Sequence, residues 1–218
     1  MRKKAVVIWG DSGHSLVVSN IISLCGQYEI VGFLDNMNPD RKGEIFDEKT
    51  IFGGVEELSL LKQKGIGHVA LGFGHCSARI AAASLLKKND FQILTLIHPE
   101  AVISNSATIG EGTVVSAGVV IDPACKVGRY AIINNSATIC HGSTIDDGVH
   151  ISPGVSIGGN VHVGLCCWVG IGSCIIDHVR IGERSYIGAG SVVAKDIPAG
   201  VVAYGNPAKI KHKVTRPF

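Results

Sequence analysis

The chain has 218 residues, of which 17% are charged, and its 20 basic and 18 acidic residues leave a formal net charge of +2. This length suits one large domain or two small ones, and the balanced charge excludes the broadly basic surface typical of nucleic-acid-binding proteins. No stretch reaches the roughly 18 apolar residues of a membrane span, and seven cysteines without a Cys-x-x-Cys spacing favour a reduced, cytoplasmic protein over a disulfide-bonded or zinc-binding one.

Residues 1–96 predict an α/β domain of the Rossmann-like type. Strands are expected at 4–9, 28–34, 67–73 and 91–96, where short apolar runs occur, and helices at 15–24, 55–64 and 76–88. Strands that alternate with helices build a parallel sheet covered by helices.

The turn after the first strand is similar to a phosphate-binding turn. Gly10 and Gly13 lie where the strand passes into a helix, whose N-terminal amides favour phosphate. Asp35 ends the next strand 22 residues after Gly13, the usual distance for an acid that binds ribose. The fingerprint is incomplete, because Ser15 stands where a third glycine is expected. An ordinary strand-to-helix turn is the alternative, in which His14 caps the turn instead of contacting a ligand.

From residue 97 an isoleucine or valine returns at every sixth position without exception. The seventeen positions are Ile97, Ile103, Ile109, Val115, Ile121, Val127, Ile133, Ile139, Ile145, Ile151, Ile157, Val163, Val169, Ile175, Ile181, Ile187 and Val193. A second set, small or β-branched, follows four residues after each from 107 to 191. This period predicts a parallel β-helix at 97–194, in which three units close an 18-residue coil, followed by a C-terminal extension at 195–218.

His141 is the strongest candidate for a catalytic base, since histidine is the natural base at neutral pH. It lies at an outward corner, and Gly159 occupies the same corner of the next coil, about 4.8 Å away. We expect free N–H groups at Gly158 and Gly159, which could hold the oxyanion of an acyl transfer. His150, half a coil further on, is a weaker candidate, and His162 is expected to be an exposed polar residue.

Four segments of the chain resemble the hexapeptide acyltransferases. They are residues 134–141 (NNSATICH), 154–164 (GVSIGGNVHVG), 187–193 (IGAGSVV) and 205–209 (GNPAK). With the glycine turn at the start, the whole chain resembles the sugar-acetyltransferase branch. That branch includes N-acetyltransferases of bacillosamine and perosamine synthesis and sialic acid O-acetyltransferases. The repeat is specific for the superfamily and much less specific for the substrate.

The resemblance implies a left-handed parallel β-helix that forms a homotrimer, with acetyl-CoA between neighbouring helices, no metal, and His141 as the catalytic base. It places the nucleotide of an amino sugar near Gly10, Gly13, His14, Asp35 and Asn36. It places the co-substrate acetyl-CoA near His150, Gly159, Gly188, Gly205, Asn206, Pro207, Ala208 and Lys209.

One departure concerns the residue after the catalytic histidine. Relatives usually carry an acid there that orients the imidazole, whereas this chain has Gly142. Asn135, Asp146 or a group from a neighbouring subunit could replace it. Cys140 adjoins His141, but its side chain is expected to point away.

The expected reaction is N-acetylation of a nucleotide-linked deoxysugar for polysaccharide or glycan biosynthesis. The 4-amino group attacks the thioester of acetyl-CoA directly, and His141 accepts the proton. Sugar O-acetylation and a non-catalytic solenoid that binds nucleotide sugars are the alternatives. Neither nucleic-acid binding nor membrane insertion is expected. The histidine spacings lack the pattern of a β-helix carbonic anhydrase.

Overall fold

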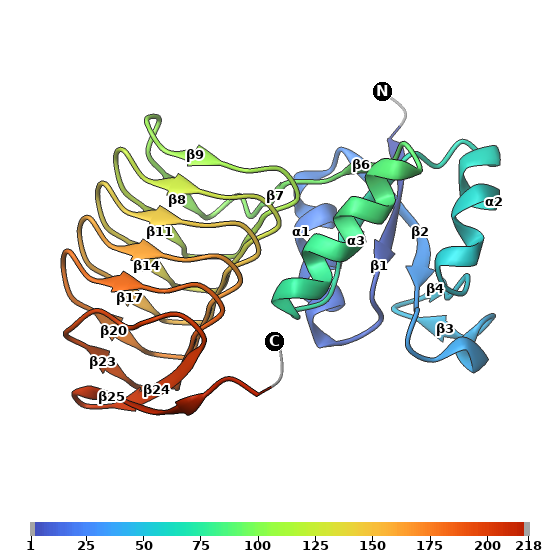
Figure 1. Cartoon of the computed structure of the whole chain (residues 1–218). Coiled ribbons are helices and arrows are strands. Elements are labelled where there is room, and N and C mark those ends of the chain that lie inside the picture. The colour runs from blue at the N-terminus through green and yellow to red at the C-terminus, as the bar shows by residue number, and fades with distance from the viewer. Residues whose placement is uncertain (1–2, 216–218) are drawn as a thin grey trace.

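The computed structural model describes residues 3–215 and consists of an α/β domain beside a stack of parallel coils (Figure 1). Residues 1–2 of the predicted first domain and residues 216–218 of the predicted C-terminal extension lie outside the described range. The α/β domain comprises β1 (Lys4–Trp9), α1 (Gly13–Cys25), β2 (Tyr28–Leu34), η1 (Pro39–Arg41), β3 (Ile45–Phe46), β4 (Lys49–Thr50), η2 (Val55–Glu57), α2 (Leu58–Gln63), β5 (His68–Leu71), α3 (Cys76–Lys88) and β6 (Gln92–Ile93).

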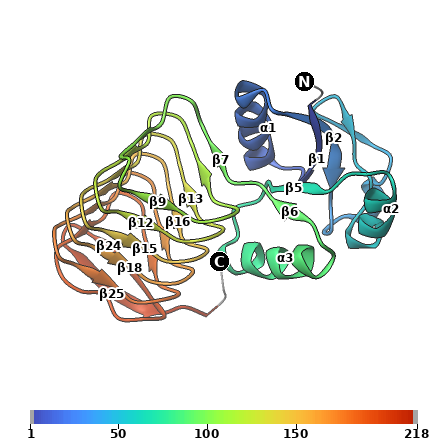
Figure 2. The same cartoon turned by 90° about the horizontal axis from the view of Figure 1, so that it is seen from above.

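The central sheet is parallel, with the strand order β2-β1-β5-β6. Apolar residues alternate along β1, so Val6 and Ile8 pack toward α1 while Val7 and Trp9 pack toward α2 and α3. The helices therefore cover both faces of the sheet (Figure 2). The predicted α/β class is confirmed.

Three predicted segments of this domain were wrong in detail. The strand expected at 91–96 is only β6, because the chain leaves the sheet edge and Leu96 already pairs with the second coil through Thr113. The helix expected at 55–64 begins as the 3-10 turn η2. The loop expected after Asp35 contains the β3–β4 hairpin.

The β-helix begins with seventeen strands of two residues, and each strand ends at one of the seventeen repeating branched residues. They are β7 (Leu96–Ile97), β8 (Val102–Ile103), β9 (Thr108–Ile109), β10 (Val114–Val115), β11 (Val120–Ile121), β12 (Lys126–Val127), β13 (Ile132–Ile133), β14 (Thr138–Ile139), β15 (Thr144–Ile145), β16 (His150–Ile151), β17 (Ser156–Ile157), β18 (His162–Val163), β19 (Trp168–Val169), β20 (Cys174–Ile175), β21 (Arg180–Ile181), β22 (Tyr186–Ile187) and β23 (Val192–Val193). The hairpin of β24 (Val201–Gly205) and β25 (Ala208–Lys213) follows.

Successive coils pair in an 18-residue register, as in Ile133 with Ile151, and form three sheets of eight, six and five strands. The branched residues from Val115 to Val193 are buried and fill the coil interior. Ile97 in the first coil is 37% exposed, because no coil lies above it. The predicted parallel β-helix is confirmed.

Arg79 of α3 joins the two domains from a fully buried position. Its guanidinium donates to the carbonyls of Leu71 (3.0 Å) and Phe73 (2.9 Å) in the α/β domain and of Gly112 (3.1 Å) and Tyr130 (2.7 Å) in the coils. Burial lowers the pKa of Arg79 to about 9, so it is charged at neutral pH. This side chain helps to fix the coils against the carboxyl end of β5, together with the contact of Cys76 Sγ with the Cys167 carbonyl at 3.6 Å.

None of the helices within residues 3–215 combines the length and apolar character needed to cross a bilayer.

Candidate active site

The first turn lies at the carboxyl ends of β1 and β5, where the strand order reverses and open α/β sheets bind ligands. Gly10 has φ +121°, and a Cβ atom there would lie 3.0 Å from the backbone of Gly72. Ser15, which replaces the expected third glycine, is fully buried and donates from Oγ to the Gly72 carbonyl at 2.9 Å. The turn is therefore anchored to the end of β5, and Gly13 remains open, since a Cβ atom added there would have no neighbour within 4 Å.

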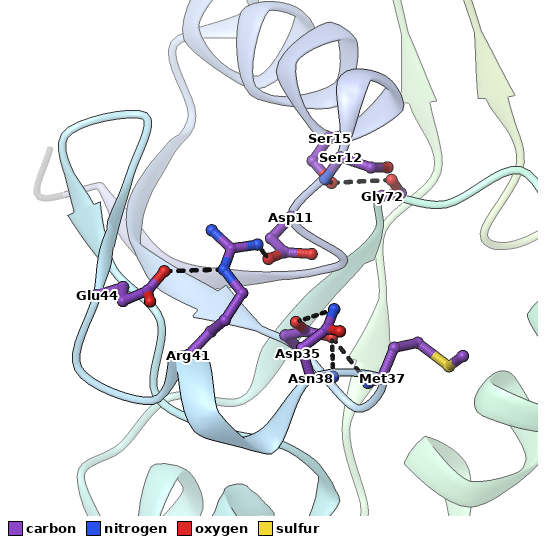
Figure 3. Close-up of polar contacts among 9 residues, drawn as sticks. All are labelled: Asp11, Ser12, Ser15, Asp35, Met37, Asn38, Arg41, Glu44 and Gly72. Carbon is purple, nitrogen blue, oxygen red and sulfur yellow. Dashed lines mark hydrogen bonds and ion pairs between the residues drawn. The ribbon is translucent and has the colours of Figure 1, made fainter.

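Asp35 and Asn36, the predicted nucleotide-binding pair, shape the loop that follows β2. Asp35 is 4% exposed and accepts hydrogen bonds from the backbone N–H groups of Met37 (2.8 Å) and Asn38 (3.3 Å) and from Asn38 Nδ2 (3.1 Å) (Figure 3). Burial opposes ionisation, but these hydrogen bonds outweigh it and lower the pKa of Asp35. Asn36 Oδ1 accepts from the Val55 N–H at 3.1 Å.

Asp11 and Arg41 form an ion pair beside this loop that the sequence did not predict (Figure 3). Arg41 Nε also donates to Glu44 Oε2 at 2.8 Å. Burial and then the neighbouring charge of Asp35 raise the pKa of Asp11, while Arg41 opposes the shift. The acidic residue inside the glycine turn was visible in the sequence, but its partner lies 30 residues away, beyond an irregular loop.

His14 and His150 lie near each other at the seam between the two domains. The His150 ring packs against Trp168 with ring centroids 4.0 Å apart and planes tilted by 32°, and its Nδ1 is 3.2 Å from the Gly74 carbonyl. Burial, the charge of Arg79 and the proximity of His150 lower the pKa of His14 to about 3. Burial also lowers the pKa of His150 to about 4. Both rings are therefore neutral at pH 7, and Nε2 of His14 is buried without a hydrogen-bond partner among the described residues.

His141 lies against Gly159, as the 18-residue register predicts. A Cβ atom on Gly159 would lie 2.8 Å from both Cε1 and Nε2 of the exposed His141 ring. The expectation of free amides was wrong, however. The Gly159 N–H donates to Asp177 Oδ1 at 2.8 Å, and the Gly158 N–H donates to the Ile175 carbonyl at 2.9 Å. Asp177 occupies the same corner one coil later, so its carboxylate reaches back along the stack.

Asp146 does not orient His141 within one chain. Its Oδ2 lies 3.0 Å from Nε2 of His162, whose Nδ1 is 3.1 Å from Arg180 Nη2. These three side chains line a groove of about 560 Å³ on the face formed by β15, β18 and β21. Gly142 has φ +68°, and a Cβ atom there would collide with Asn160 Oδ1.

Gly188 and residues 205–209 come together at the last coil. A Cβ atom on Gly188 would lie 2.6 Å from Cβ of Tyr204, so only glycine lets β24 approach this closely. Gly205 has φ +112° and donates its N–H to Ser191 Oγ at 3.2 Å. A cis bond joins Asn206 and Pro207 in the hairpin turn, and Ala208 and Lys209 begin β25.

One chain thus carries three separate patches of candidate residues. Gly10, Gly13, Asp35 and Asn36 lie at the carboxyl ends of β1 and β2, and His14 and His150 lie at the seam between the domains. His141 lies at the corner between β14 and β15, half a coil from His150, and Gly159 lies at the same corner of the next coil, between β17 and β18. Gly188 and the hairpin lie at the far end. Over residues 3–215 no group of histidine, cysteine and acidic side chains is suited to hold a metal ion.

Comparison with known sequences assigns residues 5–86 to the PglD N-terminal domain family. UDP-N-acetylbacillosamine N-acetyltransferase from Bacillus subtilis is 37% identical over 118 residues. That match covers 52% of this chain and 52% of the relative, so the chain spans about half the length of this curated protein.

Several solved structures match nearly the whole chain, among them two with bound CoA or acetyl coenzyme A. A histidine-to-asparagine variant of perosamine N-acetyltransferase from Caulobacter crescentus, in complex with CoA and GDP-perosamine, has a TM-score of 0.89 at 32% identity, covering 96% of this chain and 97% of that one. The acetyltransferase domain of PglB from Neisseria gonorrhoeae, in complex with acetyl coenzyme A, also has a TM-score of 0.89 at 32% identity, covering 96% and 100%.

Proposed function

Because the chain belongs to the PglD-like family of hexapeptide-repeat sugar acetyltransferases, we propose that it transfers an acetyl group from acetyl-CoA to the 4-amino group of a nucleotide-linked deoxysugar. The likeness to a complex of CoA and GDP-perosamine extends over 96% of the chain and carries this proposal. The product would serve polysaccharide or glycan biosynthesis, and the enzyme would work in the cytoplasm.

The separation of the three patches supports a homotrimer. His141 lies half a coil from His150, so a single chain does not offer one continuous site. We place acetyl-CoA in the groove between neighbouring β-helices, near Gly159, Gly188, His150 and residues 205–209 of the contributing chains. Residues 1–96 would form the nucleotide-sugar domain, residues 97–194 the acetyltransferase domain, and residues 195–218 an extension toward CoA. The nucleotide would lie at Gly10, Gly13, His14, Asp35 and Asn36.

In the proposed mechanism the amine attacks the thioester carbonyl directly, the C–N bond forms as the C–S bond breaks, and CoA leaves as its thiolate. His141 accepts the proton that the amine loses, and this proton then neutralises the CoA thiolate. The exposed ring of His141 is open to a substrate held between chains. Asp177 already accepts the N–H of Gly159, so we assign no oxyanion role to that amide. An acyl-enzyme on Cys140 is disfavoured, because burial, Asp122 and Asp177 raise the pKa of its thiol and suppress the thiolate.

The test is CoA thiol release from acetyl-CoA with a panel of UDP-, GDP- and dTDP-linked 4-amino sugars and their 4-hydroxy counterparts. We expect release with an amino sugar. Faster release with a hydroxy sugar would indicate O-acetylation, and nucleotide-sugar binding without thiol release would indicate a non-catalytic protein.

His141→Asn should lower turnover by about 10²–10⁴-fold, the usual contribution of general-base assistance. His178→Asn is the matched control, because His178 is also exposed on the β-helix and asparagine tolerates its φ of +62°. An unchanged rate in His141→Asn would remove the base assignment and leave the assignment of the family intact.

A further inference from the structure

Two carboxylates meet at the first turn, where the diphosphate of a nucleotide sugar would bind. Asp11 stands between Gly10 and Ser12 with a side chain 12% exposed, and Asp35 directly follows the adjacent strand β2. The two carboxyl groups lie near each other (Figure 3), and burial and then the negative charge of Asp35 raise the pKa of Asp11. An anionic diphosphate at this turn would meet like charge, which opposes binding.

Arg41 supplies the opposite charge. It lies at the end of η1, pairs with Asp11 through Nη1, and is held from the other side by Glu44 at Nε. The hydrogen bonds of Asp35 to Met37 and Asn38 shape the loop that leads into η1. The neighbouring cation Lys42 points elsewhere and pairs with Glu57. Arg41 is therefore the cation that this loop delivers to the first turn.

We propose that Arg41 is a specificity-determining residue for nucleoside diphosphates, because its pairing with Asp11 cancels a negative charge inside the phosphate-accepting turn. The inference rests on the proposed function, since it assumes that the first turn receives the diphosphate of a nucleotide sugar. Arg41 acts through Asp11. Substitution of both residues should therefore restore the nucleotide affinity that is lost when Arg41 alone is substituted.

The test measures binding of UDP, GDP and dTDP to the full chain by calorimetry, without acetyl transfer. For each nucleotide that binds the wild type, Arg41→Met should weaken the binding affinity roughly 10- to 100-fold. This is the range, roughly 10- to 100-fold, expected for an unpaired charge at a partly buried site. The double variant Arg41→Met with Asp11→Asn should return to within about threefold of the wild type, and Asp11→Asn alone should bind at least as tightly. Lys42→Met is the matched control on the same loop.

A second measurement distinguishes a loss of affinity caused by the unpaired charge from one caused by collapse of the loop. The uncharged nucleosides uridine, guanosine and thymidine should bind Arg41→Met as they bind the wild type, because they carry no phosphate to be repelled. Equal nucleotide affinity in Arg41→Met, a double variant that stays weak, or an equal loss of nucleoside binding would each overturn the inference. If the wild type binds none of the three diphosphates, the proposed nucleotide subsite fails and the inference fails with it.

Discussion

At the scale of single residues, the absence of a side chain at Gly159 sets the position of the His141 ring. A methyl group there would enter the space of Cε1 and Nε2 of His141 at 2.8 Å, so Gly159→Ala should displace the imidazole. Misplacement of a catalytic group by about 1 Å can cost on the order of 100-fold in rate, and we expect kcat to fall by about 10- to 100-fold. Steady-state thiol release measures the effect.

The control for this variant is Gly67→Ala, where the nearest atom to an added Cβ is the flexible end of Lys62 at 4.0 Å. Nucleotide affinity should be unchanged in both variants, since neither glycine lies at the first turn. A normal kcat in Gly159→Ala would contradict the close packing of the base.

The contact of His141 with Gly159 could be predicted because an 18-residue register translates sequence distance into spatial contact. The hydrogen bond that occupies the Gly159 amide was also predictable, since Asp177 lies at the same corner one coil after Gly159. The ion pair of Asp11 and Arg41 was not predictable, because no period relates a turn to an irregular loop. Residues outside a repeat are placed by packing, which sequence spacing does not report.

At the scale of elements, Arg79 ties α3 and the end of β5 to the first coils. Arg79→Met would leave four carbonyl groups without this donor, three of them in buried hydrogen bonds, and each unsatisfied buried group costs about 1–3 kcal/mol. After partial relaxation we expect the free energy of unfolding to fall by about 3 kcal/mol or more. Urea denaturation followed by circular dichroism measures it.

Arg129→Met is the matched control, because Arg129 makes an exposed pair with Asp147. Exposed pairs contribute about 0–1 kcal/mol, so this variant should be nearly neutral. Equal stabilities of the two variants would show that Arg79 does not join the domains.

The seam between β16 and the α/β domain predicts a pH dependence of stability. Folding lowers the pKa of His150 from 6.5 to about 4, so the unfolded chain binds more protons between these values. The free energy of unfolding should therefore fall as pH drops from 6.5 to 4, by about 3 kcal/mol for His150 alone. Denaturation at stepwise pH measures the slope. His150→Phe, which keeps a ring against Trp168, should reduce the slope and leave the share that comes from His14, whose pKa is lowered to about 3. An unchanged slope would exclude His150 as a source.

Elements with a strong local pattern were predicted well. The bounds of β1, β2 and α3 agree with the expected ranges, and the six-residue period located every strand from β7 to β23. The prediction of one strand at 91–96 was wrong, because this apolar run contributes one strand to the sheet edge and begins another in the first coil. The two strands are distinguished only by tertiary pairing, in which the Leu96 N–H donates to the Thr113 carbonyl.

At the scale of the whole molecule, the dispersed patches predict that activity depends on assembly. Light scattering should give a mass of three times 22.9 kDa at working concentrations. Specific activity in thiol release should fall on dilution below the dissociation range, while nucleotide binding to one chain persists. A monomeric protein with full activity would contradict the shared site.

The coil register also constrains how this chain can change in length. Insertion of 18 residues beyond Gly159 would add one complete coil, and each corner residue would still lie above the equivalent residue of the next coil. Insertion of six residues between His141 and Gly159 would keep the six-residue period, but it would move Gly159 to a different corner and remove it from His141. Insertions and deletions within the β-helix should therefore be tolerated only in multiples of one 18-residue coil.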